Sequence, residues 1–342
     1  MRALSFTALL LSLSLAGCAG APVSAPVPAP VSTAPKPDTA PKPDATPSQA
    51  APAVAIPPLD HAPQVRAKAA THMTPDELIL GVELGGDARA YPLRFLEGHG
   101  VANDTINGIP VALAYCRPCG SAVLYRTDTP KGTLTLALSG RSRDGGPLLV
   151  DRQTGTLWQP LTGTPVEGPL AGSGIELQPL PVVLTSWKRW FDSRLETRVL
   201  TGSGGDDKPT AAASGGDPAA PGVFGLVLGG AARAYPVDLV ARQGVINDEL
   251  GGRPIVIVAE PGADPANRTV RAFERGDRTF MRSGHALLGA NFLNDQNGRP
   301  WKIEEESLNA PDGRQFPRLP GRLAAQASWS AAYPRGEVYK AP

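Results

Sequence analysis

Short apolar runs separated by turn-forming residues dominate the chain after residue 58. VELGGDARAYPL, PVALAYC, AVLYRTD and TLTLALSG are examples, in which Val, Leu, Thr and Ala stand between Gly, Pro, Asn and Asp. Few stretches show the spacing of apolar residues that an amphipathic helix needs. Runs of this length and composition, bounded by turn residues, are typical of β-strands. The pattern therefore predicts a mainly β protein with sandwich or barrel-like sheets.

This pattern occurs twice along the chain. GGDARAYP at residues 85–92 is echoed by GGAARAYP at residues 229–236. At the same offset, Val101, Asn103, Asp104, Gly108, Pro110 and Asp151 match Val245, Asn247, Asp248, Gly252, Pro254 and Asp295, and with small shifts Trp158 and Trp190 match Trp301 and Trp329. Similar composition alone would not keep these positions in one order. We therefore predict two tandem related β-rich units, a first unit at 59–202 and a second unit at 221–342. They are expected to pack as one pseudo-symmetric body, joined by a flexible insert at 203–220.

Most of the shared positions are expected to build the unit. Gly85-Gly86 and Asn107-Gly108 suit tight hairpin turns, and Asn103-Asp104 is also typical of a turn. Tyr91 and Trp158 offer large apolar surfaces to a core. Function is therefore expected where the two units differ.

The first 58 residues do not have the composition of a folded unit. Residues 1–17, MRALSFTALLLSLSLAG, contain one basic residue, an apolar run and then small residues, which predicts a signal peptide. The segment from Leu15 to Cys18 resembles the bacterial lipoprotein box, in which the cysteine is lipidated and becomes the new N-terminus. The alternative is an ordinary secretory signal with a spare cysteine. Residues 18–58 are mostly Ala, Pro, Ser, Thr and Val, and they predict a disordered spacer.

These features, together with the charge balance, limit the possible location and partners. With lipid on Cys18, the protein would be an extracytoplasmic lipoprotein of the cell envelope, anchored to a membrane without spanning it. The chain has 33 basic and 32 acidic residues, a formal net charge of +1. This balance does not indicate electrostatic attraction to a nucleic-acid partner. The sequence identifies no protein partner.

The chain's remaining two cysteines lie close together, as Cys116 and Cys119. β-like runs flank the segment from Cys116 to Gly120, which predicts a hairpin tip with Gly120 free to take a positive φ. Such a tip resembles the metal knuckle of rubredoxins and zinc ribbons, whereas the thioredoxin motif opens a helix. At the offset of the repeat, His99, Cys116 and Cys119 fall on Gln243, Glu260 and Ala263, so the first unit has all three groups and the second has none.

Three kinds of site fit these residues. Two thiolates and the His99 imidazole make three metal ligands, enough for a trigonal Cu(I) site or a zinc site with one open position, and this metal site is the first hypothesis. In an oxidising compartment the cysteines can instead form a disulfide, either as a thiol–disulfide redox pair or as a structural cystine in an envelope binding module. In the third, enzymatic alternative, Cys116 is the catalytic nucleophile, His99 is its base, and Asp104 or Asp151 orients the histidine.

Several motifs together resemble the domain-of-unknown-function family numbered 3179. They are ARAYP at 88–92, HGVAND at 99–104, YCRPCGSA at 115–122, DRQTGTLW at 151–158 and WSAAYP at 329–334. The likeness covers nearly all of both units and implies no particular activity. The family's usual pattern has Pro-Leu between the cysteines, where this chain has Arg117-Pro118, and its second cysteine can be threonine. The resemblance therefore favours Cys116 over Cys119 as the essential group and counts against an obligatory disulfide.

Overall fold

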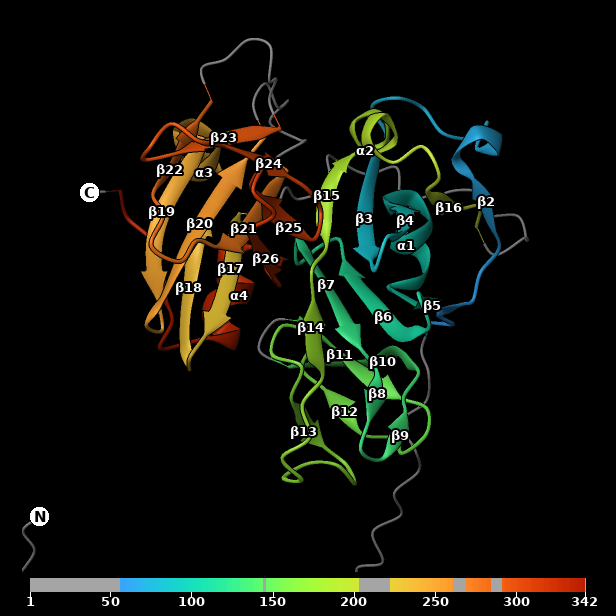
Figure 1. The fold of residues 1–342 in the computed structure, drawn as a ribbon. Helices are drawn as coiled ribbons and strands as arrows, with labels where there is room; N and C mark the ends of the chain where they lie inside the picture. Colours follow the sequence, from blue (N-terminus) through green and yellow to red (C-terminus); the bar gives the residue numbers. More distant parts are fainter. Residues whose placement is uncertain (1–55, 144–145, 203–221, 261–268, 284–290, 342) are drawn as a thin grey trace, which may run out of the picture. The chain divides into compact units, whose positions relative to one another are not determined.

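The structure of the protein, a computed structural model, describes residues 56–143, 146–202, 222–260, 269–283 and 291–341. Strands dominate these residues, so the prediction of a mainly β protein is confirmed (Figure 1). The predicted signal peptide, Cys18, nearly all of the predicted spacer and the insert at 203–220 lie outside the described residues. Within the described ranges, no helix is both long enough and apolar enough to cross a membrane.

The elements follow one another as short strands with a few single-turn or two-turn helices. The strands of the first unit are β1 (Leu59–Asp60), β2 (Gln64–Arg66), β3 (Leu78–Leu84), β4 (Asp87–Pro92), β5 (Val101–Ile106), β6 (Ile109–Cys116), β7 (Ser121–Arg126), β8 (Asp128–Thr129), β9 (Gly132–Thr133), β10 (Leu136–Arg143), β11 (Gly146–Asp151), β12 (Leu157–Trp158), β13 (Pro165–Glu167), β14 (Gln178–Leu180), β15 (Val183–Ser186) and β16 (Arg198–Leu200). Its helices are the 3-10 helix η1 (Ala67–Ala69), α1 (Leu93–His99) and α2 (Trp187–Ser193).

The second unit contains a similar series. Its strands are β17 (Val223–Leu228), β18 (Ala231–Pro236), β19 (Val245–Leu250), β20 (Arg253–Ala259), β21 (Val270–Glu274), β22 (Phe280–Arg282), β23 (Phe292–Asp295), β24 (Pro300–Ile303), β25 (Ser307–Asn309), β26 (Gln315–Leu319), β27 (Arg322–Ala324) and β28 (Glu337–Val338), and its helices are α3 (Val237–Gln243) and α4 (Gln326–Ala332).

One sheet contains strands from both units. Its order is β1-β5-β6-β7-β27-β17-β18-β28, with β14 beside β7. The first unit's strands join the second unit's strands through the antiparallel pairing of Ala122 in β7 with Leu323 in β27. Other sheets have the orders β15-β3-β4-β16-β2, β10-β11-β12-β13 and β19-β20-β21-β26-β25-β24-β23-β22. Figure 1 labels most of these strands, but not β1, β27 and β28.

Hairpin turns of the first unit form where glycine permits a left-handed backbone. Gly85 and Gly86, with φ of 57° and 78°, connect β3 to β4, and Asn107 and Gly108, with φ of 46° and 75°, connect β5 to β6. Both turns are the two-residue type that matches the twist of paired strands. The predicted turns at these two positions are therefore confirmed.

The expectation of a turn at Asn103-Asp104 is wrong, because both residues lie inside β5. The Asn103 side chain accepts a hydrogen bond from Leu136 N–H at 3.0 Å and donates one to the Leu136 carbonyl at 2.9 Å. Asp104 accepts a hydrogen bond from the Tyr91 hydroxyl at 2.7 Å. Distant groups thus bind Asn103 and Asp104 within the strand, although Asp104 Oδ1 still accepts a hydrogen bond from the next backbone N–H, of Thr105, at 2.7 Å.

The largest core side chains recur in the two units. Tyr91 and Trp158 are buried, as expected, and so are Trp190, Trp301, Trp329 and Tyr235. Trp158 donates its indole hydrogen bond to Asp151 at 2.9 Å, and Trp301 donates to Asp295 at 3.3 Å. Tyr235 donates to Asp248 at 2.7 Å, as Tyr91 does to Asp104. These matched contacts support the predicted repeat, and the pseudo-symmetry of the two units stays a prediction.

Candidate functional site

The Cys-x-x-Cys segment lies at the tip of the β6–β7 hairpin. The two strands are antiparallel, and Cys116 at the end of β6 faces Ser121 at the start of β7. The turn is closed by a hydrogen bond from Gly120 N–H to the Arg117 carbonyl at 3.0 Å. Gly120 has a φ of 55°, a conformation that glycine adopts without the steric cost of a side chain. The predicted hairpin tip is therefore confirmed.

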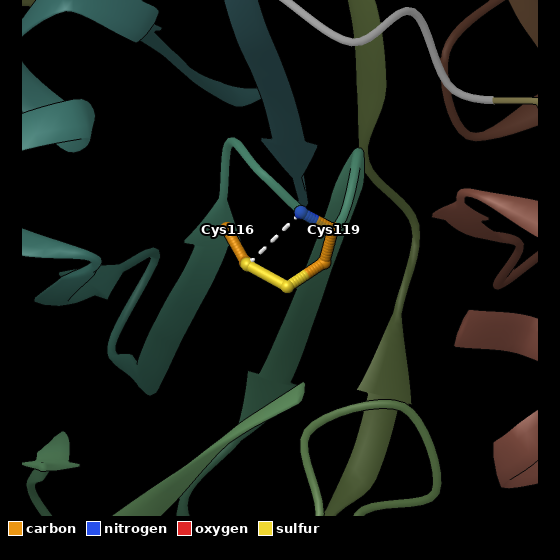
Figure 2. Close-up of a disulfide and its surroundings, with 2 residues drawn as sticks. All are labelled: Cys116 and Cys119. Carbon is orange, nitrogen blue, oxygen red and sulfur yellow. Dashed lines mark hydrogen bonds between the residues drawn. A yellow bond between two sulfur atoms is a disulfide. The ribbon is translucent and has the colours of Figure 1, made fainter. Parts of the chain in front are cut away.

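A disulfide joins the two cysteines across this turn. Their Cα atoms are 5.3 Å apart, and Figure 2 shows the two sulfur atoms bonded on one side of the hairpin. The backbone N–H of Cys119 donates a hydrogen bond to the sulfur of Cys116 at 3.2 Å. Both cysteines are partly exposed, and Pro118 between them is exposed. The cystine thus lies in a partly exposed turn, with one backbone N–H donor on the Cys116 sulfur.

An ion pair lies beside the cystine. The Arg117 guanidinium donates a hydrogen bond at 3.0 Å to the Glu97 carboxylate on α1, and both side chains are largely buried. Burial raises the pKa of Glu97, and the charge of Arg117 opposes that rise. Burial, with the nearby Glu97 charge, also raises the pKa of Tyr115 to about 12, so its hydroxyl is neutral at physiological pH. The sequence analysis did not identify Glu97 as part of this site, although it stands two residues before His99.

The second unit contacts the cystine turn through the backbone. Ala325 N–H donates a hydrogen bond to the Cys119 carbonyl at 2.9 Å, and Ala325 is the residue directly before α4. The pairing of β7 with β27 brings these atoms together. The cystine is therefore held from both units.

His99 is the last residue of α1, near the strand that ends at Cys116. The next residue, Gly100, accepts a hydrogen bond from Tyr115 N–H at 2.8 Å through its carbonyl. The ring atom Nδ1 of His99 lies 2.8 Å from the Pro57 carbonyl oxygen. A carbonyl oxygen can only accept, so Nδ1 carries a proton, and in the neutral ring Nε2 presents a lone pair.

The predicted ligand set is not assembled as a metal centre. Among the residues that the structure describes, no group of three or more His, Cys, Asp and Glu side chains is placed to hold a metal ion. Cys116 and Cys119 are joined by a disulfide, and the ring of His99 is hydrogen-bonded to the Pro57 carbonyl. Metal binding at Cys116, Cys119 and His99 therefore concerns the reduced protein.

The two aspartates proposed to orient His99 have other partners. Asp104 accepts hydrogen bonds from Tyr91 and from Gln64, and Asp151 accepts from Thr154 and Trp158. Neither carboxylate is hydrogen-bonded to the His99 ring, whose bond goes to Pro57. Both aspartates therefore stabilise the fold in this state of the molecule.

In the second unit, a charged group stands at the position that matches Cys116. Glu260 follows β20 and accepts hydrogen bonds from Arg189 and Arg271. Gln243 is the last residue of α3, and Ala263 lies outside the described residues. Glu260 thus has ionic contacts at the position where the first unit has Cys116.

Comparison with known proteins places the chain in a family. The model of the family described as a protein of unknown function, DUF3179, matches residues 54–336. The chain belongs to this family, which confirms the resemblance seen in the motifs. Searches of curated proteins and of solved structures each found no match.

Proposed function

We propose that Cys116 and Cys119 form a dithiol–disulfide redox centre. The observation that supports this most directly is the position of the cystine, partly exposed at a hairpin tip with a hydrogen-bond donor aimed at one sulfur. Structural cystines that staple loops need neither feature, whereas exchange with a second thiol needs access to sulfur and a stabilised thiolate. The substrate class is a cysteine pair of another protein, in its dithiol or disulfide form.

Cys116 is the nucleophile of the reduced form. The N–H of Cys119 favours a negative charge on the Cys116 sulfur, and Arg117, the next residue in the chain, adds a cation that is paired with Glu97. The Cys116 thiolate attacks a substrate disulfide, forms a mixed disulfide and releases one substrate thiolate, which takes the proton of the Cys119 thiol. The Cys119 thiolate then attacks the Cys116 sulfur, closes the cystine and releases the second substrate thiolate, which is protonated by water. Two electrons pass to the substrate, and the same steps in reverse oxidise a dithiol.

The test is equilibration of the folded chain with mixtures of reduced and oxidised glutathione, followed by alkylation of free thiols. We expect the cystine to be reduced reversibly without unfolding. Cys119→Ser should accumulate a mixed disulfide of glutathione with Cys116, whereas Cys116→Ser should form much less, and both are best made in a Cys18→Ser background. A cystine that is reduced only when the protein unfolds would identify a structural staple instead.

The charge of Arg117 has its own test. In the reduced protein, Arg117→Gln should move the pH midpoint of iodoacetamide reaction at Cys116 upward, because the thiolate loses a neighbouring cation. Arg141→Gln is the matched control, since Arg141 pairs with Glu167 on an exposed surface. An identical midpoint in both variants would contradict the role of Arg117.

Metal binding by the reduced form is the second candidate. It is favoured by the lone pair on Nε2 of the neutral His99 ring. The hydrogen bond from Tyr115 N–H to the Gly100 carbonyl also favours it, because it joins the residue after His99 to the residue before Cys116. Cu(I) or Zn(II) would then be held by both thiolates and His99, and affinity should fall on acidification as each ligand takes a proton. The measurement is binding of both ions by the reduced wild type and by Cys116→Ser, Cys119→Ser and His99→Ala. If the wild type binds neither ion more tightly than Cys116→Ser does, this candidate is wrong.

The place of action proposed from the sequence is the cell envelope, with the protein anchored by lipid on Cys18. Cys18→Ser should move the protein from the membrane fraction to a soluble fraction, because no acyl chain would remain. A membrane fraction that keeps the variant would rule out the lipoprotein proposal.

A further inference from the structure

A pocket of about 530 Å³ lies in the second unit, between the β17–β18 turn, the β19–β20 turn and the segment at 332–337 that joins α4 to β28. Glycine and alanine make up much of its wall, and its charged members are Arg233, Arg335 and Glu337. Together with Asp248, which pairs with Arg233, two carboxylates meet two guanidiniums. Net charge therefore does not select the ligand, and hydrogen-bond donors decide what the pocket binds.

The matching turn of the first unit shows what such a turn can bind. Gly85 and Gly86 have φ of 57° and 78°, and Gly229 and Gly230 have nearly the same values, 54° and 80°. Gly85 N–H and Gly86 N–H donate to the two carboxylate oxygens of Glu306, at 2.8 and 3.2 Å. Gly229 and Gly230 are exposed, and their N–H groups have no acceptor among the residues that the structure describes. Successive N–H groups in a turn suit an anion, so this second turn is an unfilled carboxylate site.

The adjacent turn of the second unit has also lost an acceptor. In the first unit, Asn107 N–H donates to the Asp87 carboxylate at 3.2 Å. The residues at the matching positions are Gly251 and Ala231, and alanine has no side-chain acceptor. A Cβ added to Gly229 would lie only 2.6 Å from the Gly251 carbonyl oxygen, so the two turns are in contact. Backbone donors of both turns therefore belong to one pocket.

An indole donor next to the pocket wall lacks an acceptor too. Trp190 donates its indole N–H to the Thr197 hydroxyl at 2.9 Å. Trp329 matches Trp190, and at the same offset Gly336, in the pocket wall, matches Thr197. Within the described part of the chain, the Trp329 indole N–H is buried without a partner. Polar side chains that satisfy donors in the first unit are thus missing here, which leaves room for a side chain from another molecule.

We propose that this pocket binds a glutamate side chain of a partner protein, with its carboxylate held by the N–H groups of Gly229, Gly230 and Gly251. The occupant is argued from the first unit, in which the matching turn holds a glutamate that the other unit supplies, Glu306. Arg335 lies in the pocket wall, is exposed and forms no ion pair with a described residue, so it adds a charged donor. The second unit thus docks a partner through the contact that the two units use with each other.

The test is an NMR titration of the purified, isotopically labelled full chain with a capped peptide that copies residues 303–308, IEEESL, the segment that carries Glu306. We expect saturable shifts of the amide signals of Gly229, Gly230 and Gly251. The amides of the β3–β4 turn are the internal reference, because Glu306 already occupies them. A peptide with glutamine at its three glutamate positions should bind about tenfold more weakly, since its acceptor is no longer charged.

Two variants locate the binding in the pocket. Ala231→Asp restores the carboxylate that the first unit has at Asp87, and it should weaken binding of the peptide by about tenfold, because it competes for Gly251 N–H and repels the peptide. Ala69→Asp makes the same change at an exposed position of η1 in the first unit and should bind like the wild type. Arg335→Gln should weaken binding by about threefold, as expected for one exposed charge.

Three results would overturn the proposal. They are the absence of saturable shifts at the β17–β18 turn, equal affinity of the two peptides, and equal binding of the glutamate peptide by Ala231→Asp and Ala69→Asp. Sodium acetate serves as a further probe at constant ionic strength. Acetate that binds as tightly as the peptide would also contradict a protein partner, because the pocket would then recognise a free carboxylate.

Discussion

Two strand glycines each lie against a tryptophan ring. A Cβ atom added to Gly81 in β3 would overlap the ring of Trp190, and one added to Gly225 in β17 would overlap the ring of Trp329. Neither glycine has a positive φ, so the requirement is one of space and not of backbone conformation. The close approach lets each helix, α2 or α4, pack its tryptophan directly on the first strand of a hairpin.

Gly81→Ala and Gly225→Ala should each destabilise the protein by about 1–3 kcal/mol, the usual cost of overpacking a core. The measurement is the urea concentration at the midpoint of unfolding. Gly98→Ala is the control, because nothing lies within 4 Å of the added Cβ and alanine favours the helix α1. A Gly81→Ala midpoint equal to that of the control would refute this account of the packing.

The unfolding free energy should depend on the ionisation of Glu260 at acid pH. Burial acts to raise its pKa, but Arg271 and Arg189 outweigh that effect and hold the pKa below its usual 4.5. Because the folded pKa lies below the unfolded one, the stabilisation is complete above about pH 4.5 and is lost as the pH falls through the folded value. Wild type should therefore exceed Glu260→Gln in unfolding free energy at pH 6, and the gap should close as the pH falls below about 4.5. A gap that stays constant down to pH 3 would contradict this prediction.

At the scale of elements, the cystine hairpin and helix α4 share one backbone hydrogen bond, from Ala325 N–H to the Cys119 carbonyl. The disulfide restricts the turn that carries this carbonyl. Reduction should therefore increase amide hydrogen exchange at Ala325, because the turn then opens more often. Tyr339 N–H, bonded to the Ala234 carbonyl, is a reference amide that should not change. Equal exchange at Ala325 in the oxidised and reduced protein would show that the bond does not respond to the cystine.

Local signals were enough to predict the strands and the tight turns. Asn107-Gly108 and the Cys-x-x-Cys tip carry their turn preference in their own residues, so the sequence reveals them. Asn103-Asp104 carries the same preference and lies in a strand, because Leu136 and Tyr91 supply hydrogen bonds that only the folded chain brings near. The short helices α1 to α4 have no long periodic pattern, and each is held by what it packs against.

The candidate site, too, could be predicted only where its signals are local in the sequence. The hairpin tip that carries Cys116 and Cys119 follows from their spacing and flanking strands, although the sequence favoured a metal site over a disulfide there. The contributions of Glu97 and Ala325 depend on α1 and β27, which are distant or weakly signalled in the sequence. The sequence analysis also missed the ion-pair network around Glu260 in the second unit. No local pattern marks it, because its arginines come from α2, β21 and β26.

On the scale of the whole molecule, contacts between the units are numerous and varied. The Glu306 carboxylate accepts hydrogen bonds from Gly85 N–H and Gly86 N–H, at 2.8 and 3.2 Å. Arg318 donates to the Val182 carbonyl at 3.0 Å. Together with the β7–β27 pairing, these contacts connect the β3–β4 turn, the residue before β15 and strand β7 to the second unit.

Cleavage of the chain at a protease site placed in the insert at 203–220 should therefore leave the two fragments associated. Each unit covers apolar surface of the other and completes part of its sheet, so separation would expose both. Size-exclusion chromatography under native conditions measures this, with the uncut protein as the reference. Fragments that elute separately, each folded, would show two autonomous domains.

The pairing of β7 with β27 also sets an order of events during synthesis. Cys116 and Cys119 have a sequence separation of 3 and leave the ribosome together, so their hairpin can close at once. Ala325 follows only after most of the remaining chain has been made, on the order of ten seconds later at ordinary elongation rates. During that interval the two sulfurs are bonded or left free in a nascent chain whose second unit has not yet folded. The disulfide can therefore form before the contact between Ala325 and Cys119 exists.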